Sequence, residues 1–332
     1  MSWFEQLTGF HEVSPEQVRD NLVLEGSQLK SAVNGRVFTC GTLQTPSLAE
    51  LRERVKACTH SAGKLSVREV VGDVRALHVD ESNAGALFQV ASQFNLLEMT
   101  SPKVTPEFGV GIYGNDHTQG PACAMACGAG TIFRNYFASV NGQTGQSAGN
   151  QLDCLADLGT ALNNAGNRLW EMRNGYALAS QTGLAEIAAR LQACSAQELD
   201  EYRQLLRIGI QWDTQVTVTG CSHLVTQAYC SAMPVAYARH HESLWADFAR
   251  LVLDAAYEAT ICTAILNSAA SGNNRVYLTS LGGGVFGNPT AWIMASMERA
   301  LTLYQDWNLD AAIVSYGVSN QSARQLADRF PQ

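Results

Sequence analysis

The pattern of hydrophobic and polar residues changes rhythm along the chain and predicts strands and helices in alternation. Segments 86–95, 208–220 and 311–316 have the continuous apolar run or the two-residue alternation that is typical of strands. Segments 245–267 and 291–301 repeat apolar residues at every third or fourth position, as a helix with one buried face does. Because the two kinds of element alternate, we predict an α/β protein in which helices cover both faces of a mixed, largely parallel sheet.

Two regions depart from this alternation. Residues 1–65 mix helical and short extended patterns, with a helix start at Ser14, which precedes a proline, and a second predicted helix at 48–57. Residues from about 145 to 207 repeat leucines at helical spacing between breaks that contain Asn and Gly. Strand patterns resume after this region. We therefore predict an N-terminal extension at 1–65, packed on a core at 66–332 that contains a helical insertion at about 145–207.

A glycine-rich segment at 275–289 lies between a predicted strand and a predicted helix. It contains, in order, Gly282, Gly283, Gly284, Val285 and Phe286. A strand, a glycine loop and a helix N-terminus together place bare backbone N–H groups against an anion such as phosphate. A tight turn without a ligand is the alternative, since no P-loop lysine follows and the spacing is not that of a dinucleotide-binding loop.

Composition narrows the class of protein. The chain has 332 residues, of which 46% are hydrophobic, so it can bury a sizeable core. Its net charge of −8 argues against a general nucleic-acid binder, because such proteins cluster Lys and Arg. No apolar run has the length of a membrane span, and residues 1–10 do not resemble a secretion signal. We therefore expect a cytoplasmic protein without a membrane partner.

The cysteines do not indicate a disulfide framework or a metal site. There are nine of them, an odd number, and none forms a C-x-x-C pair. Cys123 and Cys127 are four residues apart, but no second pair of Cys or His completes a zinc site. We expect reduced, buried thiols, no bound metal and no cofactor.

Three stretches together resemble the macrodomain family, which binds ADP-ribose. The sequence VGDV at 71–74, followed by the strand at 86–95, is similar to the family's Gly-Asp-Ile-Thr element and its strand ending in Asn-Ala-Ala-Asn. The loop and small-residue helix at 109–130 are similar to the family's first glycine loop, and SLGGGVFG at 280–287 resembles its Ser-Thr-Gly-Val-(Tyr/Phe)-Gly loop. The resemblance implies a three-layer macrodomain-like fold whose partners are ADP-ribose and ADP-ribosylated protein.

The resemblance also implies roles for single residues. Asp73, in a segment at 66–79 that we predict as two short strands, would accept a hydrogen bond from the adenine amino group. Asn95 would lie near the distal ribose and orient it for catalysis, with Phe286 against the same ribose. The other residues implied in ADP-ribose binding are Val74, Gln93, Gln119, Ser280, Gly282, Gly283, Gly284 and Val285. From the residues alone, Asp73 could instead cap a turn.

The chain departs from the family at the position of its acidic residue. That position holds Gln119, and the nearest carboxylate is Asp116, which either faces the ligand or forms an Asx-turn. Asp213, before another predicted strand, is a second candidate, with a surface turn as its alternative. Because a carboxylate can orient a water molecule and stabilise positive charge at C1″, we predict an ADP-ribosyl hydrolase with Asp116 or Asp213 as catalytic carboxylate.

Two alternatives to this prediction stay open. The first is a reader module that binds ADP-ribose or ADP-ribosylated protein without turnover, which the loss of the acidic residue would fit. The second is a structural α/β protein in which the glycine loop binds nothing. In its size and its insertion the chain resembles bacterial effector macrodomains that remove ADP-ribose from arginine, and such an effector would act in a host cytosol.

Overall fold

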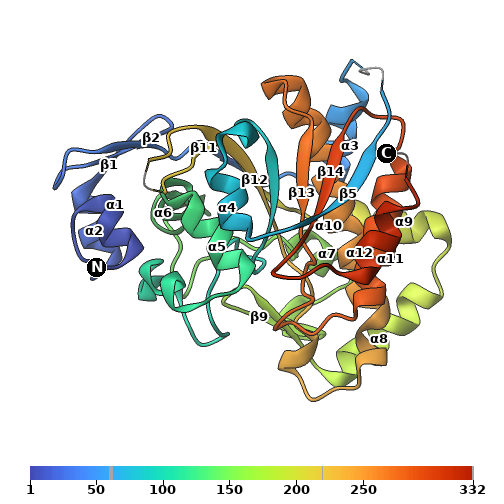
Figure 1. Cartoon of the computed structure of the whole chain (residues 1–332). Coiled ribbons are helices and arrows are strands. Elements are labelled where there is room, and N and C mark those ends of the chain that lie inside the picture. Colours follow the sequence, from blue (N-terminus) through green and yellow to red (C-terminus); the bar gives the residue numbers. More distant parts are fainter. Residues whose placement is uncertain (60–62, 219, 331–332) are drawn as a thin grey trace.

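The computed structural model describes residues 1–59, 63–218 and 220–330 (Figure 1). Its centre is a seven-stranded sheet with the strand order β4-β11-β12-β6-β13-β14-β5. In that order the strands are β4 (Thr42–Gln44), β11 (Gly209–Gln215), β12 (Leu224–Cys230), β6 (Leu87–Ala91), β13 (Arg275–Leu278), β14 (Asp310–Ser315) and β5 (Ser66–Val71). The five strands from β12 to β5 are parallel, whereas β11 and β4 are antiparallel at one edge. The predicted mixed, largely parallel sheet is confirmed.

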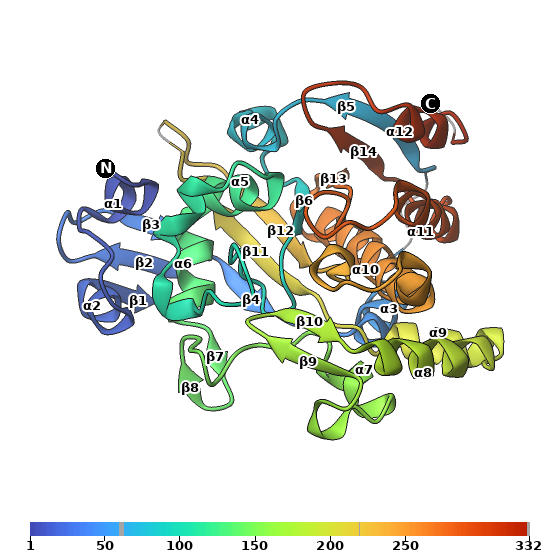
Figure 2. The same ribbon diagram turned by 90° about the horizontal axis from the view of Figure 1, so that it is seen from below.

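Helices cover both faces of this sheet (Figure 2). One face carries the long helix α10 (Glu242–Ser271), which contacts β6, β12 and β13 and is flanked by α3 (Leu48–Lys56) and α11 (Thr290–Leu303). The other face carries α5 (Gln119–Ala126) and α6 (Gly128–Tyr136), which contact β6 and β11. The remaining helices of these layers are α4 (Val74–Val79), against α5, and α12 (Gln321–Ala327), against β5 and β14. The three-layer α/β/α prediction is confirmed.

Only the first part of the predicted extension at residues 1–65 has its own small sheet, because β4 and α3 belong to the central sheet and its helix layer. Strands β1 (Leu22–Glu25), β2 (Gln28–Ser31) and β3 (Val37–Thr39) form an antiparallel meander beside α1 (Trp3–Thr8) and α2 (Pro15–Asn21). Ser14 caps α2 as expected, since its hydroxyl accepts a hydrogen bond from the Gln17 N–H. Apolar side chains of the extension share a second core with α6 and with residues 97–113. The extension is therefore packed against the segment that leads into α5.

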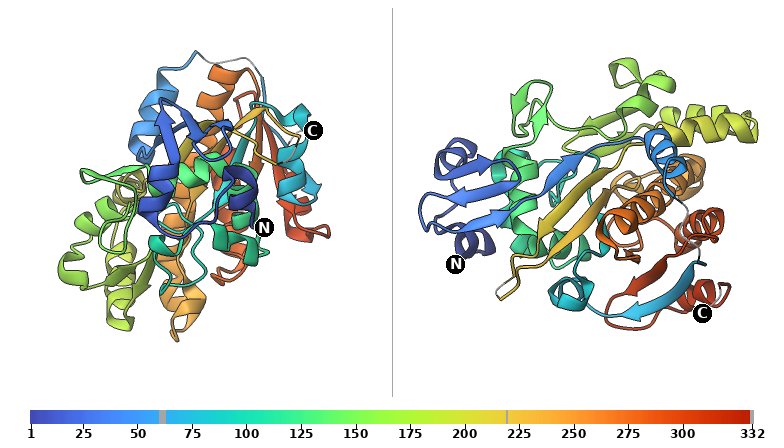
Figure 3. Two further views of the ribbon diagram at one scale, coloured as in Figure 1. Left: turned by 90° about the vertical axis from the view of Figure 1, so that its left-hand side faces the viewer. Right: turned by 90° about the horizontal axis from the view of Figure 1, so that it is seen from above.

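The insertion at residues 145–207 contains more than helices. It comprises α7 (Ala156–Ala161), a hairpin of β9 (Trp170–Arg173) and β10 (Tyr176–Ala179), α8 (Gln181–Gln192) and α9 (Ala196–Gln204). Helices α8 and α9 pack against α10, and in Figure 3 they lie at the end of the molecule opposite to the extension. The hairpin, which the leucine spacing did not predict, turns at Asn174 and Gly175 with φ values of 48° and 78°. A short ribbon of β7 (Ser139–Val140) and β8 (Gln143–Thr144) precedes the insertion.

Three local predictions were wrong. Segment 66–79 forms one strand and then α4, because the Asp73 side chain accepts from the Arg75 N–H and caps a helix. The strand predicted at 86–95 ends at Ala91, after which the chain leaves the sheet. Strand β12 was not predicted, since its buried Thr226 and Gln227 hide the apolar pattern. Over the described residues no helix is long and apolar enough to cross a membrane.

Candidate functional site

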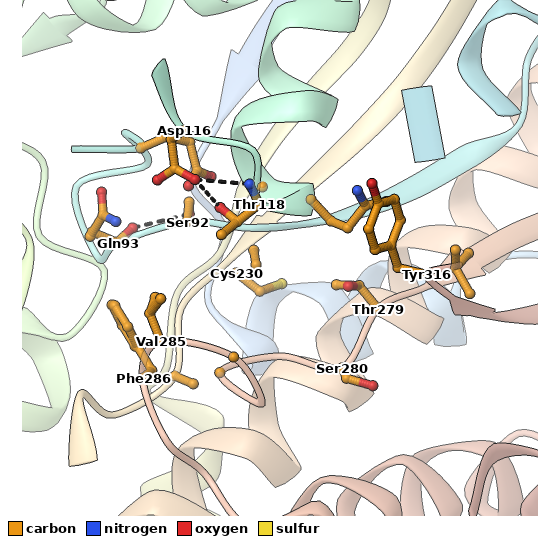
Figure 4. A pocket seen from close by; sticks show the side chains of 18 of the residues that line it. Ser92, Gln93, Asp116, Thr118, Cys230, Thr279, Ser280, Val285, Phe286 and Tyr316 are labelled. Atoms are coloured by element: carbon orange, nitrogen blue, oxygen red, sulfur yellow. Dashed lines mark hydrogen bonds between the residues drawn. The ribbon is translucent and has the colours of Figure 1, made fainter. Parts of the chain in front are cut away.

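A cavity of about 480 Å³ opens at the carboxyl ends of the parallel strands. Ala91 at the end of β6, Cys230 at the end of β12 and Ser315 at the end of β14 line it, and so do Thr279 and Ser280 directly after β13. This edge is where open α/β sheets bind their ligands, and the volume is in the range of small-molecule sites. The cavity is therefore the candidate site (Figure 4).

The glycine loop forms one wall of the cavity. Gly282, Gly284, Val285 and Phe286 line it, and their backbone N–H groups have no hydrogen-bond partner in the part of the chain that the structure describes. The loop holds its shape by other bonds, from Gly287 N–H to Gly284 O and from Asn288 N–H to Gly282 O. Free N–H groups at the end of a strand and before helix α11 make a concavity that suits an anion.

The three consecutive glycines differ in their surroundings. Gly282 has a φ of +68°, and a Cβ there would come within 2.6 Å of the Ala232 side chain, so both conformation and space demand glycine. A Cβ on Gly283 would meet Ile293, and Gly283 does not line the cavity. A Cβ on Gly284 would meet no atom within 4 Å. The predicted contact of the loop with a ligand therefore falls to Gly282 and Gly284 and not to Gly283.

Glu98, which the sequence analysis did not identify, brings a buried carboxyl group to the cavity. Only 6% of the residue is exposed, and its Oε1 atom has no hydrogen-bond partner. Burial raises the pKa of the Glu98 carboxyl well above its usual range, Arg134 lowers it and Asp116 raises it further. The Arg134 guanidinium lies 3.5 Å above the centre of the Tyr229 ring and donates a hydrogen bond to the Thr131 hydroxyl. An unpaired buried carboxyl is costly and marks a candidate functional group.

Asp116 lies on the same side of the cavity, as predicted for one of the two candidate carboxylates. Its Oδ1 atom accepts hydrogen bonds from the Thr118 N–H at 2.8 Å and from the Thr118 hydroxyl at 2.7 Å. Figure 4 shows Asp116 near Gln93 and across the cavity from Phe286. The Asx-turn and the position in the cavity occur together, so the two interpretations of Asp116 do not exclude each other.

Gln93 and Gln119 also line the cavity, but each uses its side chain inside the protein. Gln93 accepts a hydrogen bond from the Met99 N–H at 2.8 Å and faces the Tyr176 hydroxyl at 3.4 Å. The Gln119 Oε1 atom accepts from the Val74 N–H at 3.0 Å. These bonds fix the segment that carries Glu98 and the start of α4.

Three aromatic rings from separate elements close one end of the cavity. Tyr176 comes from β10, Tyr237 from the 3-10 helix η5 (Val235–Tyr237) and Phe286 from the glycine loop. Their ring centroids are 5.0 to 5.5 Å apart. The Tyr176 hydroxyl donates to Met99 O at 2.6 Å, so the hairpin of the insertion also supports the segment that carries Glu98. No Lys, Arg or His side chain of the described residues lines the cavity.

The opposite end of the cavity is formed by the connection between β14 and α12. Tyr316, Val318, Ser319 and Asn320 line it there, and the Tyr316 side chain is 61% exposed. Glu69 of β5 holds this connection, since its carboxylate accepts from the Ser319 hydroxyl and from the Asn320 N–H. An exposed aromatic ring is a platform on which a base can stack.

Two predicted catalytic residues do not reach the cavity. Asn95 is fully buried behind the wall, where its side chain donates to Gln151 and accepts from the Leu97 N–H. Asp213 is exposed at a bulge of β11, toward the end of the sheet that is opposite to the cavity. Its φ of 51° is one that Asp tolerates better than most residues, which accounts for its presence there. The expected place of Asp213 at the ligand-binding edge was wrong.

The predicted adenine-binding pair lies just beside the cavity. Asp73 is exposed, caps α4 and does not line the main cavity. Val74 lines a small adjoining pocket, which shares Gln119 and Tyr316 with the main cavity. The structure thus brings together at one edge Gln93, Asp116, Gln119, Ser280, Gly282, Gly284, Val285 and Phe286, with Val74 adjoining.

The residues that sequence analysis missed lacked a recognisable pattern. Glu98 follows an apolar run by several residues, and only an isolated carboxylate between Leu97 and Met99 could have pointed to it. Tyr176 belongs to the insertion, outside the central sheet, so the positions of the strand ends could not indicate it. Among the described residues there is no group of three or more His, Cys, Asp or Glu side chains that could hold a metal ion.

Comparison with known proteins gives structural similarity only. Neither the family models nor the curated proteins contain a match. One similar solved structure is poly(ADP-ribose) glycohydrolase from Deinococcus radiodurans in complex with ADP-ribose, at 13% identity and a TM-score of 0.45, covering 87% of this chain and 92% of that chain. Another is the Thermomonospora curvata enzyme bound to the inhibitor ADP-HPD, at 12% identity and a TM-score of 0.45, covering 95% and 97%. At these values the similarity establishes no function for this chain.

Proposed function

We propose that this chain binds ADP-ribose and hydrolyses the bond at C1″ of the distal ribose, releasing ADP-ribose from a modified protein side chain such as arginine. One observation carries the proposal: free backbone N–H groups of a glycine loop and a buried, unpartnered carboxyl group face the same cavity. The first feature suits a diphosphate and the second suits chemistry next to it.

The two ends of the cavity give the ligand a direction. The exposed Tyr316 ring offers a stacking surface for adenine at one end. Asp73, which directly precedes the Val74 of the adjoining pocket, would be the partner of the adenine amino group. The diphosphate would lie along the N–H groups of Gly282, Gly284 and Val285. The distal ribose would then reach Phe286, with C1″ toward Glu98 and Asp116.

The carboxyl groups supply the reaction. Cleavage at C1″ passes through a state with positive charge on the sugar, and a carboxylate nearby stabilises that charge and takes a proton from the attacking water. Asp116 would be this carboxylate, since its Oδ2 atom makes no hydrogen bond within the described chain. Glu98, whose pKa burial raises well above its usual range, would either donate a proton to the leaving group or ionise against the positive charge. The charge of the substrate decides between these tasks.

A reader module without turnover is the second candidate, and one observation favours it. Gln119, at the position where the macrodomain family has an acidic residue, is bound to the Val74 N–H and cannot accept a proton. In this case the cavity would hold ADP-ribose through the glycine loop alone, and Glu98 would have no chemical task.

Calorimetric titration and a release assay test both candidates. Titration with free ADP-ribose is expected to show one site, and ADP, which lacks the distal ribose, should bind more weakly. Incubation with arginine-linked and glutamate-linked ADP-ribosylated protein is then expected to release ADP-ribose from at least one of them. Binding with no release from either would establish the reader, and no binding would refute the proposal.

A further inference from the structure

We propose that Tyr113 is a positioning residue of the candidate site and that the N-terminal segment, residues 1–39, controls the site through it. The inference rests on the proposed function, since it concerns the two carboxyl groups that would carry its chemistry, Glu98 and Asp116. Tyr113 is fully buried and does not line the cavity. It belongs to the 3-10 helix η3 (Gly111–Asn115), which directly precedes Asp116.

Tyr113 holds both carboxyl-bearing segments, through two different groups. Its hydroxyl oxygen accepts a hydrogen bond from the Glu98 N–H at 2.9 Å, and its backbone carbonyl accepts one from the Asp116 N–H at 3.1 Å. The two segments come from separate places in the chain, one after β6 and the other before α5. Because a buried N–H that loses its partner is costly, the hydroxyl fixes the backbone of Glu98. Tyr113 thus sets the position of one carboxyl group relative to the other.

The side chain of Glu98 depends on this backbone contact. Its Oε1 atom has no hydrogen-bond partner within the described chain, so side-chain bonds do not fix that atom. The neighbouring Met99 is held by other groups, since its N–H donates to Gln93 and its carbonyl accepts from the Tyr176 hydroxyl. At Glu98 itself, the bond from its N–H to Tyr113 takes this part.

Helix η3 begins at a turn that is built around a carboxylate from the N-terminal segment. Glu12 accepts from the Val110 N–H at 3.0 Å and from the Gly111 N–H at 2.6 Å. A Cβ on Gly109 would lie 2.5 Å from the Glu12 carboxyl group, and one on Gly111 would lie 2.7 Å from it, so both glycines admit the carboxylate. Trp3 adds a bond from its indole N–H to Val110 O at 3.2 Å.

The N-terminal segment and the glycine loop therefore have separate tasks. Tyr113 shares a buried core with Phe4 of α1, whereas Phe286 of the glycine loop packs in the other core. Coupling between distant groups is carried by such packed side chains and hydrogen bonds. A change along the contacts from Glu12 to Glu98 should thus alter turnover and leave the affinity for ADP-ribose in place.

The test removes the hydroxyl group of Tyr113 alone. Tyr113→Phe keeps the ring and the backbone carbonyl, so only the bond to Glu98 is lost. We expect kcat for release of ADP-ribose to fall about tenfold or more, since a small misplacement of a reacting group has a large effect on rate. In the Glu98→Gln background the same change should cause no further loss, because nothing is left to position.

Tyr304→Phe is the matched control. Its hydroxyl contacts Glu258 at 3.4 Å and accepts from the Cys262 thiol at 3.0 Å, and Tyr304 does not line the cavity. This variant also loses hydrogen bonds, and it should keep the kcat of the wild type. Losses of Tyr113→Phe and Glu98→Gln that multiply in the double variant would show a merely structural hydroxyl and overturn the inference.

A second cycle tests the control by the N-terminal segment. Glu12→Gln should lower kcat, with ADP-ribose affinity unchanged, when it is assayed below the melting temperature of the variant. Combined with Tyr113→Phe it should add no further loss, because both changes act through the same hydroxyl. A kcat equal to that of the wild type, or losses that multiply, would overturn this control.

A readout without turnover separates the inference from the proposed function. If no linkage is hydrolysed, the proposed hydrolysis fails, and a carbon NMR titration of the Glu98 carboxyl group decides the inference. Burial raises the pKa of this group in the wild type, and we expect that pKa to fall in Tyr113→Phe, because the freed carboxyl group moves into the cavity. An unchanged pKa would overturn the inference. If the wild type hydrolyses and Tyr113→Phe is equally fast, only the inference is lost.

Discussion

The carboxyl group of Glu98 fills the space that a side chain on Gly120 would occupy. A Cβ on Gly120 would lie 2.7 Å from Glu98 Oε2 and 2.5 Å from Ala91 O, at the first turn of α5. The glycine thus lets a carboxyl group from another segment approach the helix N-terminus, where negative charge is favoured. A carboxyl group from the loop after β6 is thus present next to Gln119, which carries none itself.

Glu98→Gln is expected to lower activity and raise stability. The amide has the same shape but cannot ionise or transfer a proton, so turnover should fall about a hundredfold or more. Because burial raises the pKa of Glu98 in the folded state, the folded protein holds this proton more tightly than the unfolded chain and loses that advantage as pH rises. The melting temperature of the variant should therefore exceed that of the wild type increasingly from acid to neutral pH.

Glu12→Gln is the matched control for this change. Burial also raises the pKa of Glu12, but its carboxylate accepts bonds from Val110 N–H at 3.0 Å, Gly111 N–H at 2.6 Å and the Tyr136 hydroxyl at 2.7 Å. An amide would turn an NH₂ group toward these donors, at a cost of about 1–3 kcal/mol. Thermal unfolding should show a higher melting temperature than the wild type for Glu98→Gln and a lower one for Glu12→Gln. If Glu98→Gln melts at a lower temperature than the wild type, the Glu98 carboxyl group stabilises the fold, and the prediction is wrong.

Gly284→Val is expected to block ADP-ribose binding without harming the fold. A Cβ at this position meets no protein atom within 4 Å, and the residue lines the cavity beside the free N–H groups. The valine side chain would therefore enter the space of the diphosphate. Titration should show at least a hundredfold weaker binding, a loss of about 2.7 kcal/mol.

Gly149→Val provides the control for the glycine loop. Gly149 also has no protein atom within 4 Å of a built Cβ, and it lies outside the cavity. This variant should bind ADP-ribose as the wild type does, with a similar melting temperature. If Gly284→Val binds ADP-ribose as tightly as Gly149→Val does, the loop is a plain turn and the binding site lies elsewhere.

The sequence predicted the architecture well because the main elements are amphipathic or wholly apolar. Helix α10 is buried on most sides, and the central strands β6 and β14 are mostly apolar, so the hydrophobic pattern identified them. The glycine loop was recognisable because three consecutive glycines stand between a predicted strand and a predicted helix. Strand β12 was not predicted, because it contains the polar Gln227. The side chain of Gln227 can be buried only because it forms hydrogen bonds with His78 and Cys123 in the folded protein.

The residues of the proposed mechanism were only half predictable from the sequence. Asp116 stands in a loop of turn formers before a helix, which placed it at the edge of the sheet. Asn95 was expected at the cavity but is buried behind its wall, and Glu98, which was not predicted, lines the cavity instead. The chain between them turns at Leu96, which adopts a φ of 65°. This chain reversal directs Asn95 away from the cavity and Glu98 toward it. The spacing of residues in the sequence does not predict such a reversal.

Asp73→Ala is expected to weaken ADP-ribose binding about ten- to hundredfold, through loss of a charge-assisted hydrogen bond to adenine. The variant also loses the cap of α4, which should lower stability by about 1 kcal/mol. Asp80→Ala is the matched control, since Asp80 caps the next short helix through the Ser82 N–H and does not line the cavity. An equal loss of affinity in both variants would assign the effect to the caps and remove Asp73 from the adenine site.

Asp116→Asn separates catalysis from binding. Its Oδ1 atom accepts both bonds from Thr118, and an amide oxygen can accept the same two, so the loop and the affinity for ADP-ribose should be kept. The amide cannot take a proton from water, and turnover should fall about a hundredfold or more. Asp213→Asn is the control, because Asp213 is exposed, lies away from the cavity and has a left-handed conformation that Asn also tolerates. Release of ADP-ribose and calorimetric titration should be run on both variants beside the wild type. Full turnover in Asp116→Asn would leave Glu98 as the only carboxyl group of the proposed mechanism, and parallel losses of turnover and affinity would show that the substitution had merely damaged the pocket.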